Sequence, residues 1–221
     1  SNHPSIIKFI GFSPKDFEDK NKPVIITEYL PNGSLRKYID LECRGISDPK
    51  WNDTKKLIII YGIANAMAYL HHHNIIHRDL KPENILLDEN LYPKIADLGL
   101  SKDLNGISSM KGLKGTMIYM SPEILFDNDY TEKGDVYAFA MIVYEIITND
   151  QSFKDCNFST LLKKITKGIR PEINSLVPEA FKSLIERCWS QDPSCRPSFT
   201  EIVDELKEES GFITDSVDYD E

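Results

Sequence analysis

The sequence contains few cysteines, and no two of them lie close together in the chain at the spacing of a metal-binding or redox motif. The 221 residues include no C-x-x-C pattern, and the four cysteines are Cys43, Cys156, Cys188 and Cys195. A disulfide framework or a zinc knuckle needs closer and more regular spacing, so both classes are excluded. A chain of this length can bury a core without such links. We therefore expect a globular chain with reduced thiols.

Long hydrophobic runs are also lacking. The two most apolar stretches, residues 57–70 and 136–147, are interrupted by polar residues and are shorter than the ~20 residues that a membrane-spanning helix needs. They are predicted to be buried core helices, and no membrane span is expected. No charged and then apolar leader precedes Ser1, which favours a cytoplasmic location.

Positive charge is scarce. The chain has 26 lysines and arginines against 35 aspartates and glutamates, a net charge of −9. Residues 201–221 contribute most of this charge, with nine acids and the single base Lys207. Nucleic-acid-binding proteins usually show a basic stripe, so no nucleic-acid partner is expected. Residues 209–221 are interpreted as an acidic, flexible tail.

Hydrophobic periodicity predicts strands first and helices later. The runs at 5–12 and 23–30, closed by a Pro-Asn-Gly turn at 31–33, predict a β-hairpin. Residues 84–95 predict two more strands around a turn. Residues 101–118 show no period and predict a long loop. Helices are predicted from residue 34 onward. One covers 55–70, with Asp53 or Thr54 as its N-cap, and the others cover 135–147, 159–167, 178–190 and 198–209.

The most informative string is H-R-D-L-K-P-E-N at residues 77–84, which is followed by D-L-G at 97–99. Asp79 and Asn84 stand five positions apart, a separation of at most ~17 Å that shortens when the chain curls, so they can converge with Asp97. Amide and carboxylate oxygens suit Mg²⁺, which takes its other ligands from phosphates and water. The structural alternative is that these residues serve as turn and cap residues.

These residues resemble the protein-kinase catalytic loop, H-R-D-L-x-x-x-N, and the D-F-G motif of that family. The segment 115–123 ends in S-P-E where the family has A-P-E, and Arg196 and Pro197 follow near the end. The likeness covers residues 3–207. It implies an α+β, protein-kinase-like fold, with a truncated β-rich remnant of the small lobe and hinge over 1–33 and a mainly helical large lobe over 34–208.

The resemblance implies a role for each residue of the catalytic loop. Asp79 would be the catalytic base that accepts the proton of the substrate hydroxyl, and Asn84 and Asp97 would hold Mg²⁺ against the phosphates of ATP. Lys81 resembles the lysine that serine/threonine kinases direct at the transferred phosphate. Thr116 resembles the threonine that supports the catalytic aspartate. The predicted acceptor is therefore serine or threonine of a protein substrate.

The adenine site is also implied by resemblance. Thr27 stands at the gatekeeper position, Glu28 and Leu30 follow it in the hinge, and Leu86 would form the floor under the adenine. An apolar slot with a few backbone donors and acceptors suits a purine.

Other implied features are structural or regulatory. Cys188-Trp189 and Arg196-Pro197 resemble the tyrosine-kinase-like branch of the family. The resemblance also implies an ion pair between Glu123 and Arg196, and it implies that Asp135 braces the loop of His77 and Arg78.

Control by an upstream kinase is a further expectation. Because Arg78 lies next to Asp79, a phosphate on the long loop could pair with this arginine, and Ser108 and Ser109 are the candidate sites.

The chain also departs from the family pattern. Leu98 and Ser121 are mild substitutions, but there is no G-x-G-x-x-G loop and no lysine in a V-A-I-K setting. Because those parts clamp the phosphates, we expect this chain alone to bind ATP weakly, and we assign phosphoryl transfer to its intact parent. The alternatives are a non-catalytic docking or regulatory module of truncated kinase fold, and a small-molecule kinase. The latter is weakened by residues 115–123, which resemble a peptide-docking segment.

Overall fold

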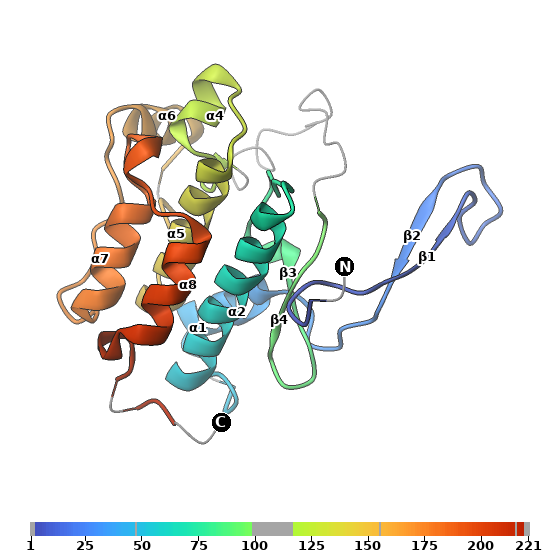
Figure 1. Ribbon diagram of the computed structural model, residues 1–221, viewed down its shortest axis with the longest axis horizontal. Helices are drawn as coiled ribbons and strands as arrows, with labels where there is room; N and C mark the ends of the chain where they lie inside the picture. Colours follow the sequence, from blue (N-terminus) through green and yellow to red (C-terminus); the bar gives the residue numbers. More distant parts are fainter. Residues whose placement is uncertain (1–2, 47, 99–116, 155, 215, 219–221) are drawn as a thin grey trace.

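The computed structural model describes residues 3–46, 48–98, 117–154, 156–214 and 216–218. A body of helices carries two small antiparallel sheets on one side, and one of these sheets projects away from the body (Figure 1). Within the described residues, no helix is both long and apolar enough to cross a membrane.

The projecting sheet is the predicted N-terminal hairpin. Strand β1 (Phe9–Ser13) pairs antiparallel with β2 (Val24–Thr27), so this prediction is confirmed. The strand expected from residue 5 begins only at Phe9, because Ile6 turns into the core and forms an isolated bridge with Ile95. The hairpin is apolar but not buried, since Phe9 and Phe12 are 62% and 61% exposed.

The second sheet lies between the hairpin and the helices. Strands β3 (Ile85–Leu87) and β4 (Pro93–Ile95) pair antiparallel, as predicted. Asp88 closes their turn, because its Oδ1 accepts the backbone N–H groups of Asn90 and Tyr92 at 2.9 and 2.8 Å. Backbone hydrogen bonds from Ile95 to Ser5 and from Ile7 to Ile95 attach the start of the chain to this sheet.

Apolar helices form the body. The α-helices are α1 (Leu35–Cys43), α2 (Asp53–His72), α4 (Pro122–Asp127), α5 (Glu132–Thr148), α6 (Phe158–Thr166), α7 (Glu179–Cys188) and α8 (Phe199–Glu208). The 3₁₀ turns are η1 (Pro82–Asn84), η3 (Pro193–Cys195) and η4 (Ser210–Phe212). The helices predicted by periodicity are confirmed, with ends shifted by up to three residues. The six-residue α4 was not predicted, because it is too short to show a period.

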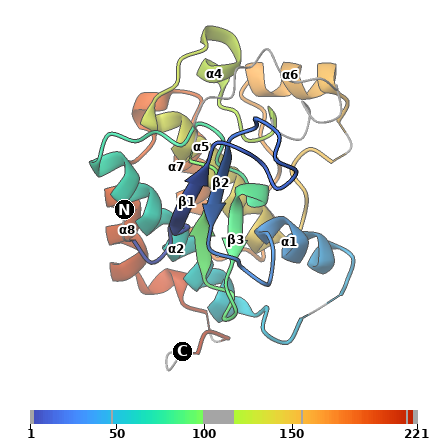
Figure 2. The same ribbon diagram turned by 90° about the vertical axis from the view of Figure 1, so that its right-hand side faces the viewer.

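Helix α5 is the centre of the body. Nearly all of its side chains are buried, and the helix packs against α2 and α7, while α2 also packs against α8. Figure 2 shows both sheets in front of these helices. A helix that is apolar on every side must be covered on every side, which accounts for the central position.

The N-cap predicted for α2 is corrected by the structure. The cap is Asn52, whose side-chain oxygen accepts the backbone N–H of Lys55 at 2.8 Å, rather than Asp53 or Thr54. Asp53 instead lies in the first turn, where a carboxylate interacts favourably with the positive end of the helix dipole.

The chain after α8 differs from the flexible tail expected over 209–221. Phe212 is only 1% exposed and packs edge-to-face on Phe181, with ring centroids 5.0 Å apart. The Ser216 hydroxyl donates to Asp53, and the backbone N–H of Asp218 donates to Thr54 Oγ1 at 2.7 Å. An aromatic side chain and a helix N-terminus therefore hold part of this acidic segment against the body.

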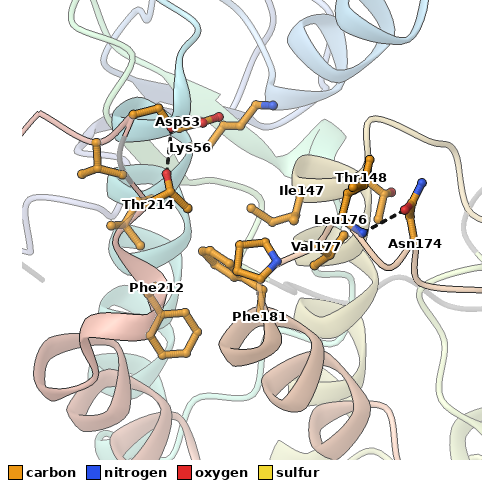
Figure 3. Close-up of a pocket in the computed structure, with 14 residues that line it drawn as sticks. Asp53, Lys56, Ile147, Thr148, Asn174, Leu176, Val177, Phe181, Phe212 and Thr214 are labelled. Carbon is orange, nitrogen blue, oxygen red and sulfur yellow. Dashed lines mark hydrogen bonds between the residues drawn. The ribbon is translucent and has the colours of Figure 1, made fainter.

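A cavity lies between this segment and the helices (Figure 3). It has a volume of about 370 Å³, and its wall comes from α2, α5, α7 and the residues around Val177. Among the residues that the structure describes, none of those predicted for the site from the sequence lines it. The cavity is therefore separate from the predicted active site.

Helix α2 approaches β4 so closely that only glycine fits at position 62. A Cβ atom on Gly62 would lie 2.6 Å from Cγ of Pro93. We expect Gly62→Ala to destabilise the fold by ~1–3 kcal/mol, as overpacked substitutions do, despite the helix propensity of alanine. Urea denaturation measures this effect. Gly11→Ala is the matched control, because a Cβ there has no neighbour within 4 Å; an equal loss in both variants would contradict the packing argument.

Candidate active site

The loop between α2 and β3 brings three predicted site residues together. The side-chain nitrogen of Asn84 donates to the backbone oxygen of Asp79 at 2.8 Å and to its Oδ2 at 3.0 Å. Lys81 Nζ donates to the other carboxylate oxygen, Oδ1, also at 3.0 Å. The Asp79 carboxylate is thereby held at both oxygens, with a positive charge on one side.

Asp135, at the start of α5, anchors this loop to the central helix. Its two carboxylate oxygens accept the backbone N–H groups of His77 at 2.8 Å and Arg78 at 2.9 Å. The same carboxylate contacts the His71 ring at 2.9 Å. Arg78 adopts a left-handed φ of 69°, a strained conformation that the hydrogen bond to Asp135 supports. The predicted brace is confirmed.

His77 and Asn84 connect the loop to the end of β4. His77 Nε2 lies 3.1 Å from the carbonyl oxygen of Ala96, and the N–H of Ala96 donates to the carbonyl oxygen of Asn84 at 2.8 Å. Asp97 follows directly, with a left-handed φ of 56°. Strained residues of this kind concentrate at functional sites.

The donor set of this site fits a hard cation. Both hydrogen bonds of the Asn84 side chain to Asp79 use its amide nitrogen, so the amide oxygen is the atom that can face a metal. Asp97 adds a carboxylate near Asn84, because it directly follows Ala96, whose backbone N–H donates a hydrogen bond to the carbonyl oxygen of Asn84. Amide and carboxylate oxygens are ligands that Mg²⁺ accepts.

The predicted adenine residues lie along the junction of the two sheets. Glu28 Oε1 accepts the backbone N–H of Lys8 at 2.8 Å and the Lys94 ammonium at 3.0 Å. Lys94 pairs with Leu86 in the β3–β4 register, which brings Leu86 to the same junction. The Glu28 side chain is therefore engaged within the protein. Its backbone N–H also donates to the carbonyl oxygen of Lys8 at 3.0 Å, so its backbone carbonyl oxygen is the group that can contact a base.

The two remaining hinge residues differ in burial. Leu30 is buried, and Thr27 is half-buried with its hydroxyl donating to the carbonyl oxygen of Glu28 at 3.3 Å. Three other predictions, Thr116 as a catalytic residue and Ser108 and Ser109 as phosphorylation sites, lie outside the described residues.

The predicted pair of Glu123 and Arg196 is confirmed. Arg196 donates from Nη1 to Oε1 at 2.6 Å and from Nη2 to Oε2 at 3.0 Å, a bidentate arrangement. Its guanidinium also lies 5.3 Å from the centre of the buried Tyr137 ring. This pair attaches α4, next to the predicted peptide-docking segment, to the turn before α8.

The same pair predicts a dependence of stability on pH. Burial opposes ionisation of Glu123, but the two hydrogen bonds and the positive charge of Arg196 outweigh it, and the pKa of Glu123 falls below its ordinary value of 4.5. A carboxyl whose pKa is lower in the folded state stabilises the fold above its unfolded pKa, and this contribution is lost as the pH falls through the folded value. We expect the free energy of unfolding to decrease below pH 4.5.

Urea denaturation at a series of pH values checks this expectation. In Glu123→Gln the decrease below the ordinary pKa should be shallower, because the titrating group is absent. The same slope in both proteins would assign the acid sensitivity to other carboxyl groups.

One cluster next to the site was missed by sequence reasoning. Arg36, in the first turn of α1, contacts Glu83 of the catalytic loop, Tyr119 and the buried Glu145 of α5. Arg36 and Glu145 are 109 positions apart, and neither belongs to a motif that we recognised. The only available signal in the sequence was Glu145 itself, a charged residue within the otherwise apolar run at 136–147.

The fold and the loop geometry define a protein kinase domain. The family model described as protein tyrosine and serine/threonine kinase matches residues 1–206, and the chain belongs to this family.

Its relatives include several kinases of Dictyostelium discoideum. One, named a probable serine/threonine-protein kinase, is 46% identical over 186 residues, which is 83% of this chain and 20% of the relative. Another with the same description is 36% identical over 92% of this chain and 15% of its own length. A probable LIM domain-containing serine/threonine-protein kinase is 37% identical over 97% of this chain and 32% of its length. The chain thus spans a third or less of these relatives.

Proposed function

We propose that this polypeptide, within its natural full-length protein, transfers the γ-phosphate of ATP to serine or threonine of protein substrates. The observation that carries the proposal is the Asp79 carboxylate, held by Asn84 on one side and Lys81 on the other. Phosphoryl transfer depends mainly on positioning and on neutralisation of charge, and a fixed carboxylate beside an ammonium supplies both.

These groups account for each bond and proton of the proposed phosphoryl transfer. The acceptor hydroxyl oxygen forms a bond to the γ-phosphorus as the bond to the bridging oxygen breaks, ADP leaves, and the hydroxyl proton passes to Asp79. Lys81, 3.0 Å from the same carboxylate, can place its positive charge against the transferred phosphoryl group.

Nucleotide binding is assigned to two groups of residues. Asn84 and Asp97 would hold Mg²⁺, which neutralises phosphate charge when it is bound. Adenine would lie against Leu86 and Leu30, with the backbone carbonyl oxygen of Glu28 as a hydrogen-bond acceptor and Thr27 at the rear of the slot. Serine or threonine as acceptor is supported by Lys81 and by the names of the relatives. A cytoplasmic location stays a prediction.

The test is an assay of the natural full-length protein with radiolabelled ATP, Mg²⁺ and a mixed protein substrate, followed by phosphoamino-acid analysis. Labelled phosphoserine or phosphothreonine is expected, with loss of labelling in EDTA. Labelled phosphotyrosine alone would overturn the acceptor assignment. A protein that binds no Mg-ATP, yet binds a specific protein partner, would instead be the non-catalytic docking module.

A further inference from the structure

Arg36 connects four parts of the large lobe. Its guanidinium donates to Asp40 one turn along α1 at 3.2 Å, and its Nε lies 3.4 Å from Glu83. Its Nη2 donates both to the Tyr119 hydroxyl and to Glu145. A planar guanidinium with five N–H donors can make these contacts at once, whereas an ammonium cannot.

The inner end of this cluster is rigid. Glu145 lies on the central helix α5 with its side chain only 2% exposed, and it also accepts the Tyr119 hydroxyl at 2.8 Å and the backbone N–H of Ser152 at 3.1 Å. Burial lowers the pKa of Arg36, but Tyr119 and Glu145 raise it by more, so the guanidinium stays charged. Arg36 is therefore fixed to the core by a buried, charge-assisted contact.

The outer end reaches the catalytic loop. Glu83 lies in η1 between Pro82 and Asn84, and its side chain is about half exposed. Asn84 is the residue whose side chain holds both the backbone and the carboxylate of Asp79. A displacement of Glu83 must move Asn84, because the two are adjacent in a single 3₁₀ turn.

We propose that Arg36 is a positioning residue, which sets the place of the catalytic loop relative to α5 through Glu83 and so keeps Asn84 aligned with Asp79. The inference rests on the proposed function for its kinetic consequence. Among the described residues of the catalytic loop, Arg36 contacts Glu83 and not Asp79 or Asn84, so it acts through Glu83.

Two alanine variants separate this role from general stability. Glu83→Ala removes the contact to the catalytic loop, and Asp40→Ala removes a contact of the same guanidinium that stays within α1. Both remove one partly exposed carboxylate from the same cation. For Glu83→Ala we expect kcat to fall about tenfold with KM for ATP unchanged, since a misplacement of 1 Å can cost up to ~10²-fold. Asp40→Ala should keep wild-type kcat.

The second measurement needs no turnover. The side-chain amide signals of Asn84 in a ¹⁵N–¹H spectrum report its hydrogen bonds to Asp79. We expect these signals to move in Glu83→Ala and Arg36→Lys, and to stay in place in Asp40→Ala. A shift in these two variants supports the positioning role even if the wild-type protein transfers no phosphate, an outcome that would overturn only the proposed function. Unmoved Asn84 signals in Glu83→Ala, or equal shifts in all three variants, would overturn the inference.

Discussion

Asp79→Asn is expected to lower kcat by a factor of ~10²–10⁴, the range typical for loss of a general base. The amide has the shape of the carboxylate but cannot take up the hydroxyl proton. It also removes the negative charge next to the Lys81 ammonium, which now lies 3.0 Å away. The side chain of Asp79 is mostly buried, so circular dichroism and a melting curve should accompany the kinetics to show that the loop is still folded.

The matched control is Asp204→Asn, the same chemical change at an exposed position on α8. It should leave both kcat and the melting temperature unchanged. Unchanged turnover in Asp79→Asn, measured beside this control, would remove Asp79 from the catalytic role and with it the central assignment of the site.

Arg196→Ala is expected to give the largest loss of stability, ~3–5 kcal/mol, the range found when one partner of a buried ion pair is removed. Arg196 is 1% exposed, and its loss would leave the Glu123 carboxylate without its bidentate partner. The variant also loses the contact with the Tyr137 ring and a hydrogen bond to the carbonyl oxygen of Ser190 at 2.9 Å. Urea denaturation gives the free energy of unfolding.

Arg187→Ala is the control for this prediction. Arg187 also pairs with a glutamate, Glu205, but its side chain is 42% exposed. Solvent-exposed ion pairs on a protein surface contribute ~0–1 kcal/mol to the free energy of unfolding, so this variant should unfold close to the wild-type midpoint. If the two arginine variants lost equal stability, burial of the Glu123 pair would not be the cause.

The regular parts of the fold could be predicted because each has a local pattern. The alternating runs before residue 31 predicted the hairpin, periodic apolar residues predicted α8, and long apolar stretches predicted α2 and α5. Errors arose where a long-range contact decides the outcome. Ile6 reads as a strand residue but packs into the core beside Ile95, and Phe212 lies in an acidic segment but packs on Phe181.

The candidate site divides in the same way. Asp79, Lys81 and Asn84 lie within six consecutive residues, so a motif could predict that they meet, and the structure brings them together. The roles of these residues, and those of Asp97, stay predictions. The cluster of Arg36 with Glu145 could not be found from sequence, because its members come from separate elements and meet only after the helices pack.

Helix α5 supplies two of the supports of the catalytic loop, Asp135 at its first turn and, through Arg36, Glu145 near its last. This helix is also the most deeply buried element of the core. The loop therefore has little freedom to melt by itself, and its geometry and the global fold belong to one cooperative unit. We expect heat to disrupt the catalytic loop and the helical body together, in a single transition, rather than to melt the loop first.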